Sequence, residues 1–337
     1  MKGSRLKTAT IRERAPFAVG LPRNYVPWIV LVIVVVVFSL LAPGFLSVTN
    51  FMTVLNAASI VGLVSLGLTF VLLAGGFDLS VAAIMLVGSM IFGTLFINSH
   101  LPVGAAVLLS LAVATGLGLV NGLVVTKVKL PPFIATFATM FAFTGIAIGV
   151  GGGAAIYSVT HPFFTFLGQG KLGIMPLPAV IFIAVAIVAY LVLSGTTFGR
   201  AVYAVGDNDK AAHMAGINVD RTRIITYLIG GFLAGLAGLI LTARLEVANV
   251  VQATVAGYSA TLLDAISAVM IGGISIFGGE GKIYGLIGGI LLVFVLGNGM
   301  AILGLAITYH MLAKGFLILL AVGLDIYFRS RVSSRSR

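Results

Sequence analysis

Few residues of this 337-residue chain have the types and spacing that chemistry requires. The best candidate for phosphate binding is the run Gly278-Gly279-Glu280-Gly281-Lys282-Ile283. A P-loop needs G-x-x-x-x-G-K-[ST], so that backbone amides surround the phosphates and a hydroxyl reaches Mg²⁺. Here Ile276 stands at the first glycine position and Ile283 at the hydroxyl position. We therefore expect no cofactor on this chain, and if the protein uses ATP with Mg²⁺, another subunit must bind it.

The histidines and the absence of cysteine argue against an enzyme. His100, His161, His213 and His310 are scattered without the spacing of metal ligands. The chain has no cysteine, which excludes disulfides, thiolate catalysis and cysteine-based metal sites. A membrane enzyme would gather polar groups near one interface, and no such cluster stands out. We predict no catalytic residue and no metal site.

The composition predicts an all-α polytopic membrane protein. Hydrophobic residues make up 60% of the chain and charged residues only 9%, against about 25% charged in soluble domains. Several apolar runs approach or exceed the roughly 20 residues that cross a bilayer, and they are continuous rather than alternating as in a β-barrel. The ten predicted spans are 25–42, 51–74, 79–97, 103–126, 133–150, 178–194, 223–244, 259–277, 283–303 and 309–327.

The distribution of positive charge predicts the orientation. With the N-terminus inside, seventeen of the twenty Lys and Arg residues face the cytoplasm, as the positive-inside rule requires. Residues 1–24 are then a cytoplasmic tail rather than a cleaved signal peptide, because no small-residue cleavage site follows the first apolar run. Residues 25–327 form the transmembrane domain, with 199–223 on its cytoplasmic side, and 328–337 form a basic cytoplasmic tail. Topology accounts for the net charge of +11, so we expect a lipid membrane and no nucleic acid as partner.

Two external segments and three charges within or between spans stand out. Segments 151–177 and 245–258 are long; the first suits either an amphipathic lid or a hairpin-like connection with aromatics at the membrane interface. Charges within a membrane are costly and point to function. Asp264 and Lys314 lie at comparable depth, so they either pair or face polar surroundings separately. With Asp78 they are too dispersed for a proton relay.

Three separated stretches resemble one family, the permeases of carbohydrate ATP-binding-cassette importers of the ribose, xylose and arabinose group. They are Gly75-Gly76-Phe77-Asp78-Leu79-Ser80-Val81, the stretch from Gly199-Arg200 to Asn218-Val219, and Leu263-Asp264-Ala265 with Gly272-Gly273 and Gly278-Gly279. Ala82 stands where the family usually has glycine. The resemblance runs from about residue 45 to 327. Its motif residues are Gly75, Gly76, Asp78, Ser80, Gly272, Gly273, Gly278 and Gly279.

The resemblance implies a type II importer fold of about ten helices, with paired permeases as a homodimer or as two different chains. It also implies a cytoplasmic ATPase, a periplasmic substrate-binding protein and the bacterial inner membrane. A sugar would cross by alternating access. An ion-gradient-driven secondary carrier is the alternative, and a membrane enzyme is a third hypothesis.

Within this resemblance, residues 199–223 are expected to couple to the ATPase. Asp207 or Asp209 can cap a short helix, Ala211, Ala212 and Ala215 leave little bulk for a partner groove, and Gly216 can end the helix in a left-handed conformation. The predicted coupling residues are Asp207, Asn208, Asp209, Ala211, Ala212, Gly216 and Ile217. Arg221 and Arg223 are expected at the membrane boundary.

Sugar hydroxyls need hydrogen-bond donors and acceptors along their path. The small polar residues that we predict to line it are Asn56, Ser59, Ser65, Asn121, Thr136, Thr139, Asp264 and Asn298.

Overall fold

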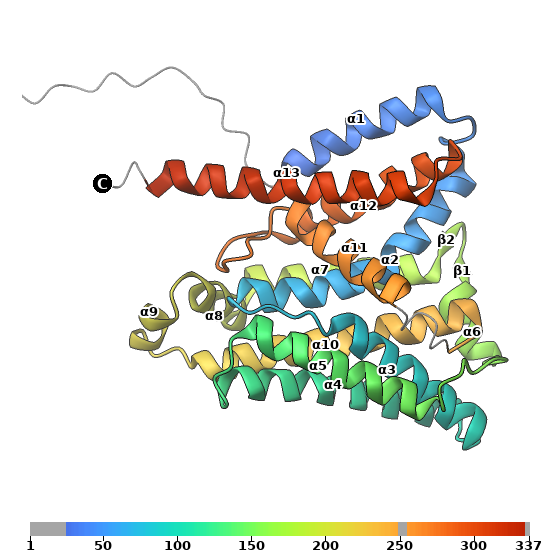
Figure 1. Cartoon of the computed structure of the whole chain (residues 1–337), viewed down its shortest axis with the longest axis horizontal. Helices are drawn as coiled ribbons and strands as arrows, with labels where there is room; N and C mark the ends of the chain where they lie inside the picture. The colour runs from blue at the N-terminus through green and yellow to red at the C-terminus, as the bar shows by residue number, and fades with distance from the viewer. Residues whose placement is uncertain (1–24, 249–254, 334–337) are drawn as a thin grey trace, which may run out of the picture.

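The computed structural model describes residues 25–248 and 255–333, which form a bundle of helices (Figure 1). In chain order the helices are α1 (Val26–Leu41), α2 (Val48–Leu73), α3 (Val81–Gly93), the π-helix η2 (Thr94–Asn98), α4 (Val103–Thr126), α5 (Pro132–Val150), α6 (Pro162–Gln169), α7 (Leu177–Gly195), α8 (Thr197–Asp207), α9 (Asp209–Met214), α10 (Val219–Leu245), α11 (Val255–Ile271), α12 (Ile283–Ile302) and α13 (Ile307–Ser333). The described sheet is one antiparallel hairpin of β1 (Lys171–Leu172) and β2 (Met175–Pro176).

The helical, membrane-type architecture predicted from composition is confirmed. Within residues 25–248 and 255–333, seven helices are long and apolar enough to cross a membrane: α2, α3 continued by η2, α4, α5, α7, α10 and α12. The other three predicted spans correspond to shorter apolar helices over Val26–Leu41, Ala260–Ile271 and Ile307–Leu319. The predicted tail 1–24 lies outside the described residues, as do 249–254 of the second external segment and the last residues of the C-terminal tail, 334–337.

Several predicted helix boundaries were wrong, and polar residues explain two of them. The span predicted to start at residue 223 begins at Val219, because Asn218 caps it and accepts a hydrogen bond from the Arg221 backbone nitrogen at 2.9 Å. The span predicted to start at 51 begins at Val48, capped by Ser47. The span predicted to reach residue 277 ends at Ile271, because Gly272 and Gly273 interrupt it.

The core lies around α2 and α10. Of the seven candidate spans, α2 is the most completely buried, and α10 packs against α2, α3 and α4. These contacts form a glycine seam, defined by the pairs Gly67–Gly230, Gly88–Gly235 and Gly118–Gly231. A Cβ added at the first member of each pair would lie 3.0, 3.3 and 3.1 Å from the opposite Cα. Backbones that approach so closely are typical of membrane helix packing by small residues.

Two groups of short elements lie at opposite ends of the bundle (Figure 1). Helices α8 and α9 extend from one end, and α6 with the β1–β2 hairpin lies at the other. The segment 151–177 therefore holds the short helix α6 and a hairpin, and its expected role as a lid or docking surface stays a prediction. The end with α8 and α9 also carries the loops 74–80, 127–131 and 272–282, and it is the predicted cytoplasmic end.

Candidate functional site

At the α8–α9 end, glycines from three distant stretches of the sequence meet. We call this contact the glycine junction and define it as Gly75, Gly206, Gly278 and Gly279 with the Leu73 carbonyl. A Cβ at Gly278 would lie 2.7 Å from the Gly206 oxygen and 2.9 Å from the Gly75 Cα. The Gly279 nitrogen donates a 3.1 Å hydrogen bond to the Leu73 oxygen. Each of the three stretches of the family resemblance thus supplies glycines to one contact.

The junction requires glycine for two physical reasons. Gly75, Gly278 and Gly279 have φ values of +73°, +88° and +72°, in the left-handed region that residues with a Cβ rarely adopt. Gly206 has an ordinary helical backbone, but a Cβ there would strike the Leu73 carbonyl and the Gly279 backbone nitrogen. Backbone atoms cannot change rotamer as a side chain can, so α8 packs against these loops backbone to backbone only because residue 206 is glycine.

Helix α8 is positioned by its cap and its buried face. The Thr196 hydroxyl accepts a 3.1 Å hydrogen bond from the Gly199 nitrogen at its start. Val202 and Val205 are buried on one face. The Tyr203 hydroxyl donates a 2.8 Å hydrogen bond to the Gly281 carbonyl. Burial raises the pKa of Tyr203 above its ordinary value, so this hydroxyl keeps its proton and the bond.

The short helix α9 lies within the predicted coupling segment 199–223 and projects beyond the glycine junction (Figure 1). Its cap is Asn208, whose side chain accepts from the Ala211 nitrogen at 3.0 Å; the capping role expected of Asp207 or Asp209 was wrong. Asn can accept this bond as well as Asp. Gly216 has a φ of +83° after the helix, as expected of its stop. Ile217, half-buried, bonds back through its nitrogen to the Ala212 carbonyl at 3.0 Å.

The surface of α9 has two distinct faces. Ala212 is buried, whereas Asp207, Asn208, Asp209, Ala211 and Gly216 are exposed. Met214 is 88% exposed, an unusual position for a large apolar side chain at the tip of a polar segment. The face around Ala211 and Met214 is therefore available to a partner, and the Ala212 face holds α9 to the rest of the chain.

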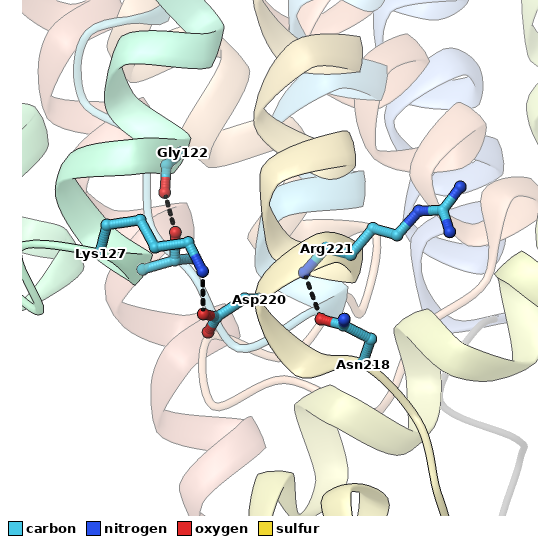
Figure 2. A network of polar contacts seen from close by, with 6 residues as sticks. Gly122, Lys127, Asn218, Asp220 and Arg221 are labelled. Atoms are coloured by element: carbon cyan, nitrogen blue, oxygen red, sulfur yellow. Dashed lines mark hydrogen bonds and ion pairs between the residues drawn. The ribbon is translucent and has the colours of Figure 1, made fainter.

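Arg223 links α9 and α10 to the end of α2. Its guanidinium donates to the Ala74 carbonyl and to the Asp209 carboxylate, each at 3.3 Å. Figure 2 shows a second link, where Lys127 after α4 and Asp220 of α10 point toward each other; their charged atoms lie 2.7 Å apart, and both side chains are exposed. The Arg221 side chain points away from that pair.

A buried polar network supports the loop between α2 and α3. The Asp78 Oδ1 accepts from the Ser80 nitrogen at 2.8 Å and from its hydroxyl at 2.7 Å. The Asn121 amide donates to the Ser80 hydroxyl at 2.6 Å, and the Thr139 hydroxyl donates to Asn121 at 2.7 Å. The network therefore ties this loop to α4 and α5.

Burial raises the pKa of Asp78 to about 6, and the hydrogen bonds from Ser80 and Asn121 limit the rise. The other oxygen of this carboxyl group, Oδ2, is buried without a hydrogen-bond partner in the described part of the chain. The hydrogen bonds therefore hold this carboxyl group in one position, and burial brings its pKa closer to neutral pH.

The predicted path residues lie in several places. Asn121, Thr136 and Thr139 surround the Asp78 loop, where Thr136 and Tyr227 both donate to the Phe77 carbonyl. The Ser65 hydroxyl bonds to its own helix at the Val61 carbonyl. The remaining four residues lie away from the Asp78 loop and are described next.

At the opposite end, the Asn298 amide exchanges two 2.9 Å hydrogen bonds with Asn50. Asn56 accepts from the Ser59 hydroxyl through its backbone carbonyl and lines a cavity of about 350 Å³ together with Lys171. Asp264 forms an ion pair with Lys314 at 2.6 Å, one of the two arrangements expected. These residues do not gather into one cluster.

The sequence did not single out Tyr203 or Tyr227 as site residues. It predicted Arg223 at the membrane boundary, before the start of a span, whereas the structure places Arg223 within α10. Two of the motif glycines lie directly after α11: a Cβ at Gly272 would lie 2.6 Å from the Leu286 Cα, and Gly273 has a φ of +78°. Gly76 approaches the Tyr227 hydroxyl, which a Cβ would meet at 3.1 Å. A tyrosine in an apolar helix is a polar handle that requires a partner, and this property could have singled out Tyr227.

Known proteins match this chain along most of its length. The family described as branched-chain amino acid transport system / permease component matches residues 50–322. The ribose import permease protein of Bacillus subtilis (strain 168) is 39% identical over 326 residues, 96% of this chain and 98% of its own. That of Haemophilus influenzae is 35% identical over 90% of this chain and 93% of its own. The fructose import permease protein of Rhizobium meliloti is 35% identical over 90% of this chain and 85% of its own. No solved structure matches it.

Proposed function

Since the chain belongs to the branched-chain amino acid transport system / permease component family, we propose that it is the permease subunit of an ATP-driven sugar importer in the bacterial inner membrane. The relatives that match it are import permeases for ribose and fructose. They support a monosaccharide as the transported solute and a transporter subunit rather than an enzyme. Ten spans, both termini in the cytoplasm and a type II importer fold complete the proposal.

One observation carries the mechanism. Helix α9 follows directly after the glycine junction in the chain. At that junction the ends of α2 and α8 and the loop between α11 and α12 contact one another through backbone atoms. An ATPase that binds the face around Ala211 and Met214 would act on these elements together, because no flexible side chain lies between them. Nucleotide-driven movement of the ATPase is thereby converted into movement of the helices that open and close the path.

The proposal assigns the choice among sugars to a periplasmic binding protein. The predicted path residues do not form one cluster, and three of them are engaged in holding the Asp78 loop. This arrangement favours a path with weak contacts to the solute. The permease works as one of a pair, either two copies of this chain or two related chains.

The test is transport by a reconstituted system. The chain is placed in proteoliposomes with a cytoplasmic ATPase and a periplasmic binding protein of an importer of this family, and uptake of labelled ribose and fructose is followed. We expect uptake only with ATP on the ATPase side and with the binding protein outside. Uptake by the chain alone, driven by a proton or sodium gradient, would instead establish an ion-gradient-driven carrier.

A further inference from the structure

Two oppositely charged residues meet inside the apolar part of the bundle. Asp264 lies within the apolar stretch Ala260–Ile271 of α11, and Lys314 lies within Ile307–Leu319 of α13. Their charged atoms are 2.6 Å apart, with side chains 14% and 27% exposed. On the seven described helices that are long enough to cross a membrane, charged residues lie only in the first and last turns of α10. Charges at membrane depth are costly and are kept where they serve function.

The attachment of α13 depends on this pair for a physical reason. Helix α13 contacts α11 more extensively than α12, and its opposite face exposes Leu312, Phe316 and Leu319. Lipid tails are as apolar as these side chains, so the hydrophobic effect gives α13 little reason to prefer α11 to lipid. An ion pair inside the membrane has no competing water, so it can favour one position and one rotation of α13 against α11.

The pair also lies on a direct route from the glycine junction. Asp264 precedes Gly272 by eight residues of helix, about 12 Å along its axis at 1.5 Å per residue. The loop after α11 is closed by the hydrogen bond from the Ser275 nitrogen to the Glu280 carbonyl at 2.9 Å, and it contains Gly278 and Gly279. A displacement at the junction therefore reaches α11 first, and α13 through the ion pair.

We propose that Asp264 and Lys314 are positioning residues that make α11 and α13 move as one unit during transport. This inference rests on the proposed import function. The pair carries no net charge, so it can stay closed while the helices change their position relative to the rest of the bundle. It transmits movement and takes no part in ATP hydrolysis.

The test uses the reconstituted complex of permease, ATPase and binding protein. Asp264→Asn and Lys314→Met are expected to lower sugar uptake per ATP hydrolysed roughly tenfold, with ATP hydrolysis still present. The charge swap Asp264→Lys with Lys314→Asp is expected to recover most of the uptake. Met311→Leu, an exposed change on the same helix, serves as the control and should behave as wild type.

A distance measurement separates positioning from mere folding. The chain has no cysteine, so spin labels can be attached at Leu263→Cys and Leu312→Cys, both exposed positions. We expect one unchanged distance between nucleotide-free and ATP-trapped complexes in the wild-type background, and a broadened distribution with Lys314→Met.

The inference would be overturned by single variants with wild-type uptake per ATP, or by an α11–α13 distance that changes with nucleotide in the wild-type background. A charge swap that folds but transports no better than the single variants would also contradict it. Failure of wild-type uptake to depend on ATP would instead reject the import function, which distinguishes the two proposals.

Discussion

The Gly279 nitrogen donates a 3.1 Å hydrogen bond to the carbonyl of Leu73, the last residue of α2. The bond joins the loop after α11 to the end of α2, the most buried candidate span, and both of its atoms lie next to Gly206 of α8. A rigid connection of this kind transmits force only while no side chain separates the backbones. The predictions below test that connection and the residues around it.

Gly206→Ala is expected to separate hydrolysis from transport. The new Cβ would meet the Leu73 carbonyl and the Gly279 nitrogen, so α8 must shift at a cost of about 1–3 kcal/mol. ATP hydrolysis by the reconstituted complex should continue while uptake falls. Gly195→Ala is the matched control, because a Cβ there meets nothing within 4 Å. Equal uptake by the two variants would show that the close backbone contact at the junction is not needed to couple ATP hydrolysis to transport.

Ala211→Leu and Ala212→Leu are neighbouring changes with different expected results. Ala211 is exposed, so its enlargement should leave the thermal stability of the isolated permease within about 0.5 kcal/mol while abolishing its stimulation of the ATPase. Ala212 is buried, so its enlargement should destabilise the isolated permease by about 1–3 kcal/mol. Thermal unfolding in detergent and ATPase assays separate these effects. A loss of stability from Ala211→Leu would mean that this face is not a docking surface.

Arg223→Gln is expected to lower uptake per ATP, whereas Lys127→Ala is not. Arg223 joins Asp209 to the Ala74 carbonyl and is half-buried, so its loss frees α9 from the end of α2. The Lys127–Asp220 pair is exposed on both sides, and such pairs contribute less than about 1 kcal/mol. Transport assays on both variants in parallel test the contrast, and similar defects would contradict it.

The buried Asp78 predicts a dependence of stability on pH. Its pKa is raised from 3.8 to about 6 on folding, so between these values the folded state holds a proton that the unfolded state has released. The free energy of unfolding should therefore fall as pH rises from about 4 to 6, by up to about 3 kcal/mol. Asp78→Asn removes the titration and should remove this fall. A wild-type stability that tracks the Asp78→Asn variant across this range would disprove the burial effect.

The sequence was sufficient for helices whose ends carry clear breakers. The span predicted over 103–126 matches α4, because Pro102 precedes it and a short polar turn follows. Hydropathy misplaced the start of α10, since Asp220, Arg221 and Arg223 lower the local average although they are helical. Asn218, an amide side chain directly before the helix, is the local pattern that could have placed this boundary.

The site could be predicted only in part. Short patterns such as Gly-Gly beside Asp78 identified the residues, and Gly216 was assigned its left-handed stop correctly. Their meeting at one junction could not be predicted, because Leu73, Gly206 and Gly279 come together through the packing of several helices. Likewise the rotation of each helix decides that Asn121 and Thr139 hold a loop, and single-sequence patterns do not fix that rotation.

The glycine seam along α10 has a consequence for how this chain can change over evolutionary time. A Cβ at Gly118 would strike the Tyr227 carbonyl oxygen, and at Gly67 and Gly88 it would lie 3.0 and 3.3 Å from the Cα of the opposing glycine, so the backbone of α10 has to yield to any larger residue at these positions. Drift at these sites needs a paired change on α10, which random single substitutions rarely supply. The lipid-exposed positions Leu108 and Leu109 of α4 have no such partner and can exchange freely among apolar residues. Sequence divergence should therefore be strongly one-sided around each helix.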